Sequence, residues 1–159
     1  MSAHLEPLTP DEYVVFREWA IHDYATENVR AGDWSDAEAT RRSQEDIDQL
    51  LPEGERTKGH HLYSIVAEPG NRRVGVVWFS TEGSGSPGVG FVYNLVVYEN
   101  YRRKGYAYQA MRDMENIALK EGITRVGLHV FEHNGPAIAL YRKLGYVTTS
   151  INMAKALKP

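Results

Sequence analysis

The feature that most constrains the fold is a basic loop placed between an apolar strand pattern and an amphipathic helix pattern. Residues 89–97 are almost entirely apolar, and Arg102, Arg103 and Lys104 follow shortly before apolar residues at helical spacing. Those apolar residues are Ala107, Ala110, Met111, Met114 and Ile117. A helix N-terminus carries free N–H groups and a partial positive charge, so adjacent cations there favour phosphate binding. The alternative is a solvated basic helix start.

Glycine in this loop strengthens the phosphate interpretation. Gly105 can adopt a positive φ angle and places no Cβ between the backbone and a ligand, and Ala107 keeps the first helical turn small. The backbone amides from Arg103 to Ala107, Tyr106 included, add to the three cations. The loop therefore predicts an extended ligand whose pyrophosphate lies on residues 102–107.

A second segment, residues 128–146, contains a strand pattern, an asparagine and a short helix pattern that ends at a glycine. Together the two segments resemble the GNAT superfamily of acyl-CoA-dependent N-acyltransferases. The family loop Arg/Gln-x-x-Gly-x-Gly/Ala is matched by Arg102, Gly105 and Ala107, and the later motif by Asn134, Leu140, Tyr141, Gly145 and Tyr146. The two motifs cover about a third of the chain.

The resemblance implies an α/β (α+β) fold with a mixed, mostly antiparallel central sheet and helices on both faces. It implies that residues 1–159 form a single domain. The implied activity is acetyl transfer from acetyl-CoA to a primary amine of a small molecule or peptide, by direct attack in a ternary complex. A covalent acetyl-cysteine is excluded because the chain has no cysteine. The alternative function is a non-catalytic acyl-CoA-binding or interaction domain.

The resemblance also assigns roles to single residues. Tyr141 would lie beside the thioester sulfur as the general acid, since a phenol that titrates near ~10 can protonate a thiolate that titrates near ~8.5. Its alternative is a half-buried helix tyrosine that packs on the core. Asn134 would bind the cofactor arm, cap the following helix, or do both. The backbone of Leu95, Val96 and Val97 would pair with the amide-rich pantetheine arm.

The base that removes the amine proton is not clear from the sequence. Many family members place a carboxylate on the strand before the phosphate loop, but residues 89–97 contain none. The candidates are His129 on the following strand, Glu99 after the central strand, or water. His129 can also be an ordinary core histidine.

The order of elements follows from periodicity and from capping signals. The patterns predict strands over 4–8, 61–68, 73–81, 89–97, 123–130 and 146–153, with helices beginning after Thr9 and Ser35 and near 106 and 136. The Gly- and Ser-rich residues 82–88 form a connection. Two strand–helix–strand units, 89–130 and 123–153, should be right-handed crossovers. Only about 14 residues follow Gly145, fewer than the terminal hairpin of the family needs.

Charge separates the chain into two parts. Residues 1–55 carry 14 acidic and 4 basic side chains, and residues 56–159 carry 7 acidic and 14 basic ones. The acidic part would attract a cationic amine through its field, unless its charges are merely solvated helix faces. Nucleic acid is not expected as a partner, and neither is a membrane, because no long basic stripe and no apolar span occur. A homodimer stays open.

Two further expectations concern metals and location. Adjacent residues of a strand face opposite ways, so His60 and His61 do not form a metal site. The absence of cysteine and of a secretory signal pattern fits the cytoplasm.

Overall fold

The central feature of the protein is one mixed sheet, described in a computed structural model that covers residues 2–82 and 85–159. In chain order the main elements are β1 (Ser2–Pro7), α1 (Pro10–Arg30), α2 (Asp36–Leu50), β2 (His60–Glu68), β3 (Arg72–Ser80), β4 (Val89–Val97), α3 (Tyr106–Lys120), β5 (Arg125–Leu128) and α4 (Gly135–Lys143), with short 3₁₀ turns η1 (Gly54–Arg56) and η2 (Glu99–Tyr101). The strand order is β1-β2-β3-β4-β5, antiparallel throughout except for the parallel pair β4–β5. The expected mixed, mostly antiparallel sheet is confirmed.

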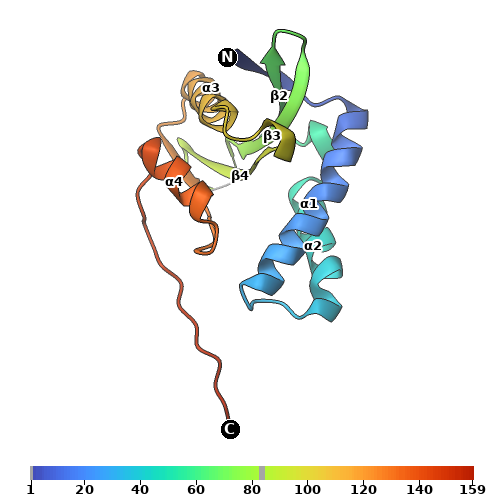
Figure 1. Cartoon of the computed structure of the whole chain (residues 1–159), viewed down its shortest axis with the longest axis vertical. Coiled ribbons are helices and arrows are strands. Elements are labelled where there is room, and N and C mark those ends of the chain that lie inside the picture. The colour runs from blue at the N-terminus through green and yellow to red at the C-terminus, as the bar shows by residue number, and fades with distance from the viewer. Residues whose placement is uncertain (1, 83–84) are drawn as a thin grey trace.

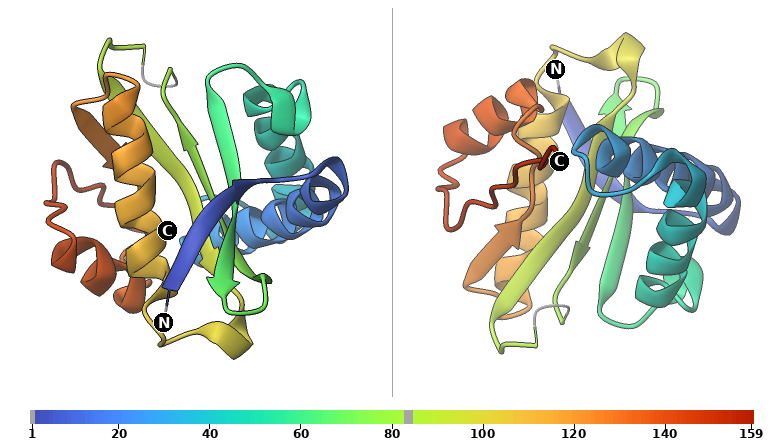
Figure 2. Two further views of the ribbon diagram at one scale, coloured as in Figure 1. Left: turned by 90° about the horizontal axis from the view of Figure 1, so that it is seen from above. Right: turned by 90° about the horizontal axis from the view of Figure 1, so that it is seen from below.

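Helices cover both faces of this sheet (Figures 1 and 2). α1 and α2 lie on one face, where Phe16 and Ile47 belong to the same buried cluster as Trp78. α3 and α4 lie on the other face, where Met111 packs in a cluster with Phe79 and the half-buried Tyr141. Both clusters are apolar, so burial of the two sheet faces holds the layers together. The expected placement of helices on both faces of the sheet is therefore also confirmed.

Capping residues fix where the helices begin, as the sequence predicted. The Thr9 side chain accepts a hydrogen bond from the Glu12 amide at 3.2 Å, and the Glu12 side chain accepts one from the Thr9 amide at 3.0 Å. This reciprocal pair satisfies amides that the first turn of α1 leaves free. Gly122 follows α3 with a φ angle of 84°, the left-handed conformation in which a helix commonly ends.

The predicted strand over residues 146–153 is wrong. The structure assigns no strand to residues 146–159, and the second strand–helix–strand unit is therefore absent. In Figure 1 this tail leaves the body of the protein as an extended segment. The residues alternate in polarity as a strand does, but a strand also needs a hydrogen-bonded neighbour, and residues 146–153 pair with no strand of the described part of the chain. β5 is also shorter than predicted. In the connection predicted over residues 82–88, residues 83 and 84 lie outside the described residues.

The two adjacent histidines face opposite sides of the sheet, as predicted. His60 accepts a hydrogen bond from the Trp78 indole at 3.0 Å, on the α1/α2 side. His61 stacks on Phe79, on the α3 side, with ring centroids 4.9 Å apart. Within residues 2–82 and 85–159, no three His, Cys, Asp or Glu side chains group as a metal site. No helix in that same part of the chain is long and apolar enough to cross a membrane.

Gly75 marks the tightest approach between two backbones of the sheet. A Cβ atom at this position would lie 2.1 Å from the Val96 carbonyl oxygen of β4. We expect Gly75→Ala to lower the free energy of unfolding by about 3 kcal/mol or more, because neither backbone can move without breaking the ladder. Denaturant titration measures this effect. Gly135→Ala is the control, since its Cβ would meet nothing within 4 Å, and it should change stability by less than about 1 kcal/mol.

Candidate functional site

An open backbone edge on β4 forms the floor of the candidate site. β4 pairs with β5 only from Val89 to Val92, whereas its pairing with β3 continues as far as Val97. β5 ends at Leu128, so the later part of β4 has no strand beside it on that edge within the described residues. This stretch of β4 contains Leu95, Val96 and Val97, the three residues predicted to bind a cofactor arm, although the Val96 carbonyl oxygen faces Gly75 of β3. An amide-rich ligand can add to such an edge like another strand.

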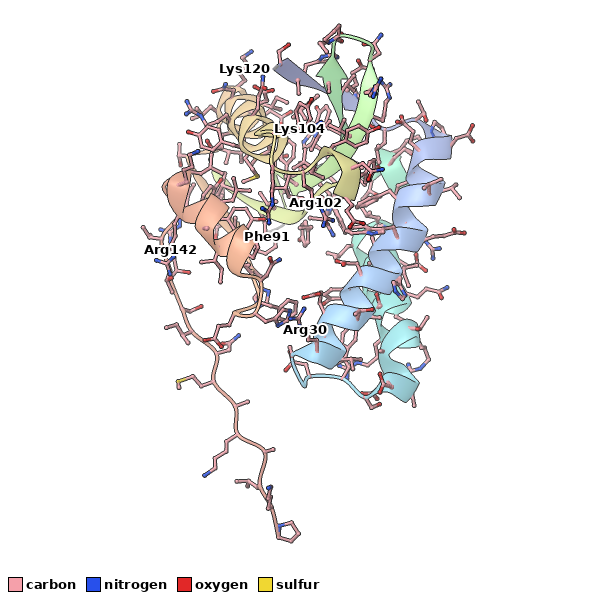
Figure 3. All side chains as sticks on the ribbon, in the orientation of Figure 1. Arg30, Phe91, Arg102, Lys104, Lys120 and Arg142 are labelled. Carbon is pink, nitrogen blue, oxygen red and sulfur yellow. The ribbon has the colours of Figure 1, made fainter. Side chains whose placement is uncertain are left out.

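The loop between β4 and α3 brings the predicted cations to the end of this edge. Arg103 and Gly105 have positive φ angles of 63° and 85°, which turn the chain sharply into α3. The Arg102 guanidinium donates from Nε to the Val97 carbonyl oxygen at 2.8 Å, so this side chain is anchored to the strand. Arg102, Arg103 and Lys104 are all exposed, and Figure 3 marks Arg102 and Lys104 on this loop.

The first turn of α3 lacks a side-chain cap. Its N-cap residue is Gly105, and no acidic side chain lies in the first turn. A Cβ at Gly105 would meet nothing within 4 Å, so the glycine is required by its backbone conformation and not by crowding from protein atoms. A helix N-terminus that follows three cations and has no acidic side chain in its first turn suits an anionic ligand.

Tyr141 projects from α4 into the cluster between α3 and the sheet. Its ring lies 5.9 Å from the Tyr146 ring, edge to face, and its side chain is half-buried. Burial raises the pKa of the Tyr141 hydroxyl above its ordinary value. At neutral pH the phenol therefore keeps its proton. No hydrogen bond to this hydroxyl occurs among the described residues, so the proton has no protein acceptor there.

Asn134 caps α4, which confirms one of its two predicted roles. Its side-chain oxygen accepts a hydrogen bond from the Ala137 amide at 3.3 Å, and the residue is exposed. The cap fixes the start of the short helix that carries Tyr141. Contact between Asn134 and a cofactor stays a prediction.

His129 lies just beyond β5, not on it as predicted. Its side chain is exposed, so it is not a core histidine, and its ring meets Phe131 edge to face at 4.8 Å. Phe131 in turn stacks on His133 at 5.4 Å. The loop between β5 and α4 therefore carries three adjacent rings. Glu99, another candidate base, is exposed in η2.

One contact of the site could not be inferred from sequence. His133 hydrogen-bonds through Nε2 to the Glu27 carboxylate of α1, and both side chains are only about a quarter exposed, at 22% and 25%. The two residues are 106 positions apart, so no local pattern connects them. This pair joins α1 to the loop that precedes α4. In Figure 1 these two elements come from opposite layers of the protein.

Asp23 lies one helical turn before Glu27 and shares its environment. Burial, followed by the negative charge of Glu27, raises the pKa of Asp23 above its ordinary value, although His22 opposes this. Four other acidic side chains of α1 and α2 pair with arginine, as Asp48 does with Arg17 at 2.8 Å. Glu27 thus contacts the β5–α4 loop through His133, and Asp23 adds a second negative charge next to Glu27.

The aromatic residues near β4 and α1 have mainly packing roles. Tyr93 stacks on Trp78 with ring centroids 4.8 Å apart. Trp34 contacts Tyr24 edge to face at 5.1 Å and carries the Arg42 guanidinium over its ring. Both rings therefore take part in packing within the protein.

Comparison with known proteins places these features in a family. The chain matches the model of the Acetyltransferase (GNAT) family over residues 14–146. It is 32% identical over 157 residues to YdgE, an uncharacterized N-acetyltransferase of Bacillus subtilis (strain 168), with 99% of both chains covered. It is 35% identical over 157 residues to YycN of the same organism, covering 99% of this chain and 100% of YycN.

Two solved structures extend the comparison. The crystal structure of YycN from Bacillus subtilis matches this chain with a TM-score of 0.92 at 34% identity, covering 99% of this chain and 100% of YycN. PaiA N-acetyltransferase from Thermoplasma acidophilum, solved in complex with coenzyme A, matches with a TM-score of 0.70 at 18% identity, covering 96% of this chain and 94% of PaiA. At that identity the likeness to PaiA concerns the fold.

The raised pKa of Asp23 gives a stability prediction with a definite sign. A carboxyl whose pKa is raised by folding contributes stability at low pH, and this contribution is lost as the pH rises through the folded-state pKa. The ionised Asp23 therefore destabilises the free protein at neutral pH. We expect Asp23→Asn to raise the Tm at pH 7, with the gain disappearing at acidic pH. Asp33→Asn, at an exposed carboxyl, is the control and should leave the Tm nearly unchanged.

Proposed function

The chain belongs to the GNAT acetyltransferase family, and we propose that it transfers an acetyl group from acetyl-CoA directly to a primary amine in a ternary complex. The observation that carries this proposal is the basic loop, which leads from the open edge of β4 into the uncapped N-terminus of α3. This arrangement supports binding of a ligand with both a pyrophosphate and an amide-rich arm. Acyl-CoA has both.

The cofactor contacts follow from this geometry. Arg102, Arg103 and Lys104 would neutralise the pyrophosphate, and the amides from Gly105 to Ala107 would hydrogen-bond to it. The pantetheine arm would pair with the edge of β4 at Leu95, Val96 and Val97. Arg102 already donates to one lone pair of the Val97 carbonyl oxygen, and the second lone pair could accept a hydrogen bond from the arm. The amide of Asn134 would bind the arm from the other side.

Tyr141 supplies the proton that the leaving group needs. The amine nitrogen attacks the thioester carbonyl carbon, the C–S bond breaks, and the thiolate takes the phenolic proton of Tyr141. The raised pKa makes this phenol a weaker acid in the free protein. The same apolar surroundings also raise the basicity of the departing thiolate. The pKa values of the phenol and of the leaving thiol therefore rise together, and proton transfer between them stays feasible.

The acceptor would be a cationic amine, for which α1 provides the negative charge. Asp23 and Glu27 lie on the helix opposite the β5–α4 loop, and Glu27 is bonded to His133 of that loop. A bound ammonium group would compensate the repulsion between the two carboxylates. The amine must then lose a proton, and His129, Glu99 or water remain the candidate acceptors.

A non-catalytic acyl-CoA-binding domain is the second candidate, favoured by the absence of a carboxylate on β4. A thiol-release assay with acetyl-CoA separates the two functions when it covers amines, amino acids, polyamines, aminoglycosides and peptides. Turnover with a cationic amine supports the transferase. Tight cofactor binding without turnover for every acceptor class would support the binding domain.

Gly105→Val should abolish most acetyl-CoA binding. The substitution forces a β-branched residue to a φ angle of 85° at the point where the amides of α3 meet the pyrophosphate. Calorimetry with acetyl-CoA should show a loss of at least about tenfold in affinity, or about 1.4 kcal/mol.

Gly122→Val is the matched control for this variant. Its φ angle of 84° is nearly the same, and a Cβ there also meets nothing within 4 Å, but it lies at the opposite end of α3. Both variants should lose similar stability, and only Gly105→Val should lose the cofactor. Equal affinities in the two variants would contradict the loop assignment.

Tyr141→Phe should lower kcat and leave cofactor binding intact. The substitution keeps the ring in its cluster and removes the proton donor, and general-acid catalysis contributes typically 10²–10⁴-fold, or about 3–5 kcal/mol. A thioester with a more acidic leaving thiol should partly rescue the variant. Near-normal kcat with acetyl-CoA, where chemistry limits the rate, would exclude the acid role, and loss of cofactor binding would assign Tyr141 to binding.

A further inference from the structure

A groove lies beside β5, outside the candidate acetyl-transfer site. It has a volume of about 460 Å³ and lies between the C-terminal half of α3, the start of β5 and residues 144–149. Apolar side chains dominate part of its wall, including Leu119, Ile123, Val126 and Leu144. Leu119 is 63% exposed although it is a large apolar residue on a packed helix.

β5 is itself an open edge along this groove. It pairs with β4 on one side, and in the described part of the chain no strand pairs with its other side. Open strand edges carry unpaired backbone N–H and C=O groups, which pair readily with another strand. The groove and the edge together therefore lack both an apolar cover and a hydrogen-bonding partner.

The C-terminal tail has the chemistry that both features lack. Val147, Ile151, Met153 and Leu157 are 78%, 76%, 91% and 85% exposed. The first three share one face of an extended chain with Thr149, while Thr148, Ser150 and Asn152 occupy the other face. A strand with one apolar and one polar face suits the edge of a sheet that is covered on one side.

The tail begins at the groove but does not fill it. Tyr146 is fixed, because its hydroxyl donates to Glu115 of α3 at 2.8 Å and its amide donates to the Tyr141 carbonyl at 2.9 Å. Val147 and Thr149 still line the groove wall, and the rest of the tail then extends away from the body. An arm that leaves its own domain with its apolar face uncovered has the form of a segment exchanged between copies.

We propose that residues 147–153 form a strand on the open edge of β5 in a second copy of this chain, with the exchange made in both directions. The apolar face of the arm enters the groove against Leu119 and Ile123, and the polar face points outward next to Arg125. A two-fold arrangement covers both grooves and pairs both edges of β5 at once. Each copy thereby supplies the final strand that the other lacks.

Cross-linking distinguishes exchange between copies from folding back within one chain. The chain has no cysteine, so introduced thiols react without competition. We expect a copy with Arg125→Cys, mixed with a tagged copy with Ser150→Cys, to form a disulfide-linked heterodimer under mild oxidation, since paired side chains on neighbouring strands lie ~5 Å apart. Arg125→Cys mixed with Thr40→Cys, on exposed α2, is the control and should not cross-link.

Two outcomes of this experiment would overturn the proposal. The first is an absence of heterodimer from the mixed copies. The second is a cross-linked monomer, and no dimer, when one chain carries both Arg125→Cys and Ser150→Cys, because the arm would then lie on its own sheet.

Mass measurement gives a second test that does not depend on the cross-link. Light scattering of the wild type at ~50 μM should give about 36 kDa, twice the 18.0 kDa of one chain. The double substitution Ile151→Asp and Met153→Asp should give a folded monomer, because charge on the arm opposes its burial. Val14→Asp with Val15→Asp alters exposed apolar side chains of α1 and should stay dimeric. A monomeric wild type, or an Ile151/Met153 variant that stays dimeric, would contradict the exchange.

Discussion

The early end of β5 is the constraint on which the rest of the structure depends. Because the parallel pairing stops at Val92 and Leu128 while β4 continues to Val97, one edge of a central strand stays open in the described structure. The unpaired N–H and C=O groups of this edge need water or a ligand as hydrogen-bond partners. The basic loop begins where this edge ends, so the open backbone leads directly to the start of α3, where we propose that the pyrophosphate binds.

The parts of this site that are local in sequence are those that sequence reasoning predicts. The positive φ angle of Gly105, the three cations before α3 and the cap at Asn134 each depend on a few neighbouring residues. The central strands and the helix starts are predicted for the same reason, because periodicity and capping are short-range effects. The roles of Tyr141 and of the open β4 edge in acetyl transfer came from family resemblance, and stay proposals.

Contacts between distant segments are where prediction from one sequence fails. Nothing near Glu27 indicates that it meets His133, and the exposure of His129 depends on β5 ending one residue before it. The same limit explains the wrong strand over 146–153. Alternating polarity indicates which side chains of a segment suit burial and which suit solvent. A strand forms only when the backbone of the segment also pairs with another strand. The alternating pattern is present, but residues 146–153 do not pair with the open edge of β5 in the described structure.

Asp23 and Glu27 of α1 carry charges that lower the stability of the free protein but would stabilise a complex with a cationic ligand. The half-buried Asp23 and Glu27 carboxylates repel each other, which lowers the stability of the free protein. His133 offsets part of that cost at Glu27, whereas His22 only partly opposes the effect of burial and of Glu27 on Asp23. A cationic amine is the kind of ligand that compensates the Asp23 charge. Because ligand binding stabilises a protein by mass action, the charge that weakens the free protein also increases the gain from binding an amine. In the proposed reaction, α1 would therefore form the acceptor side of the protein, and the cations of residues 102–104 would face the cofactor.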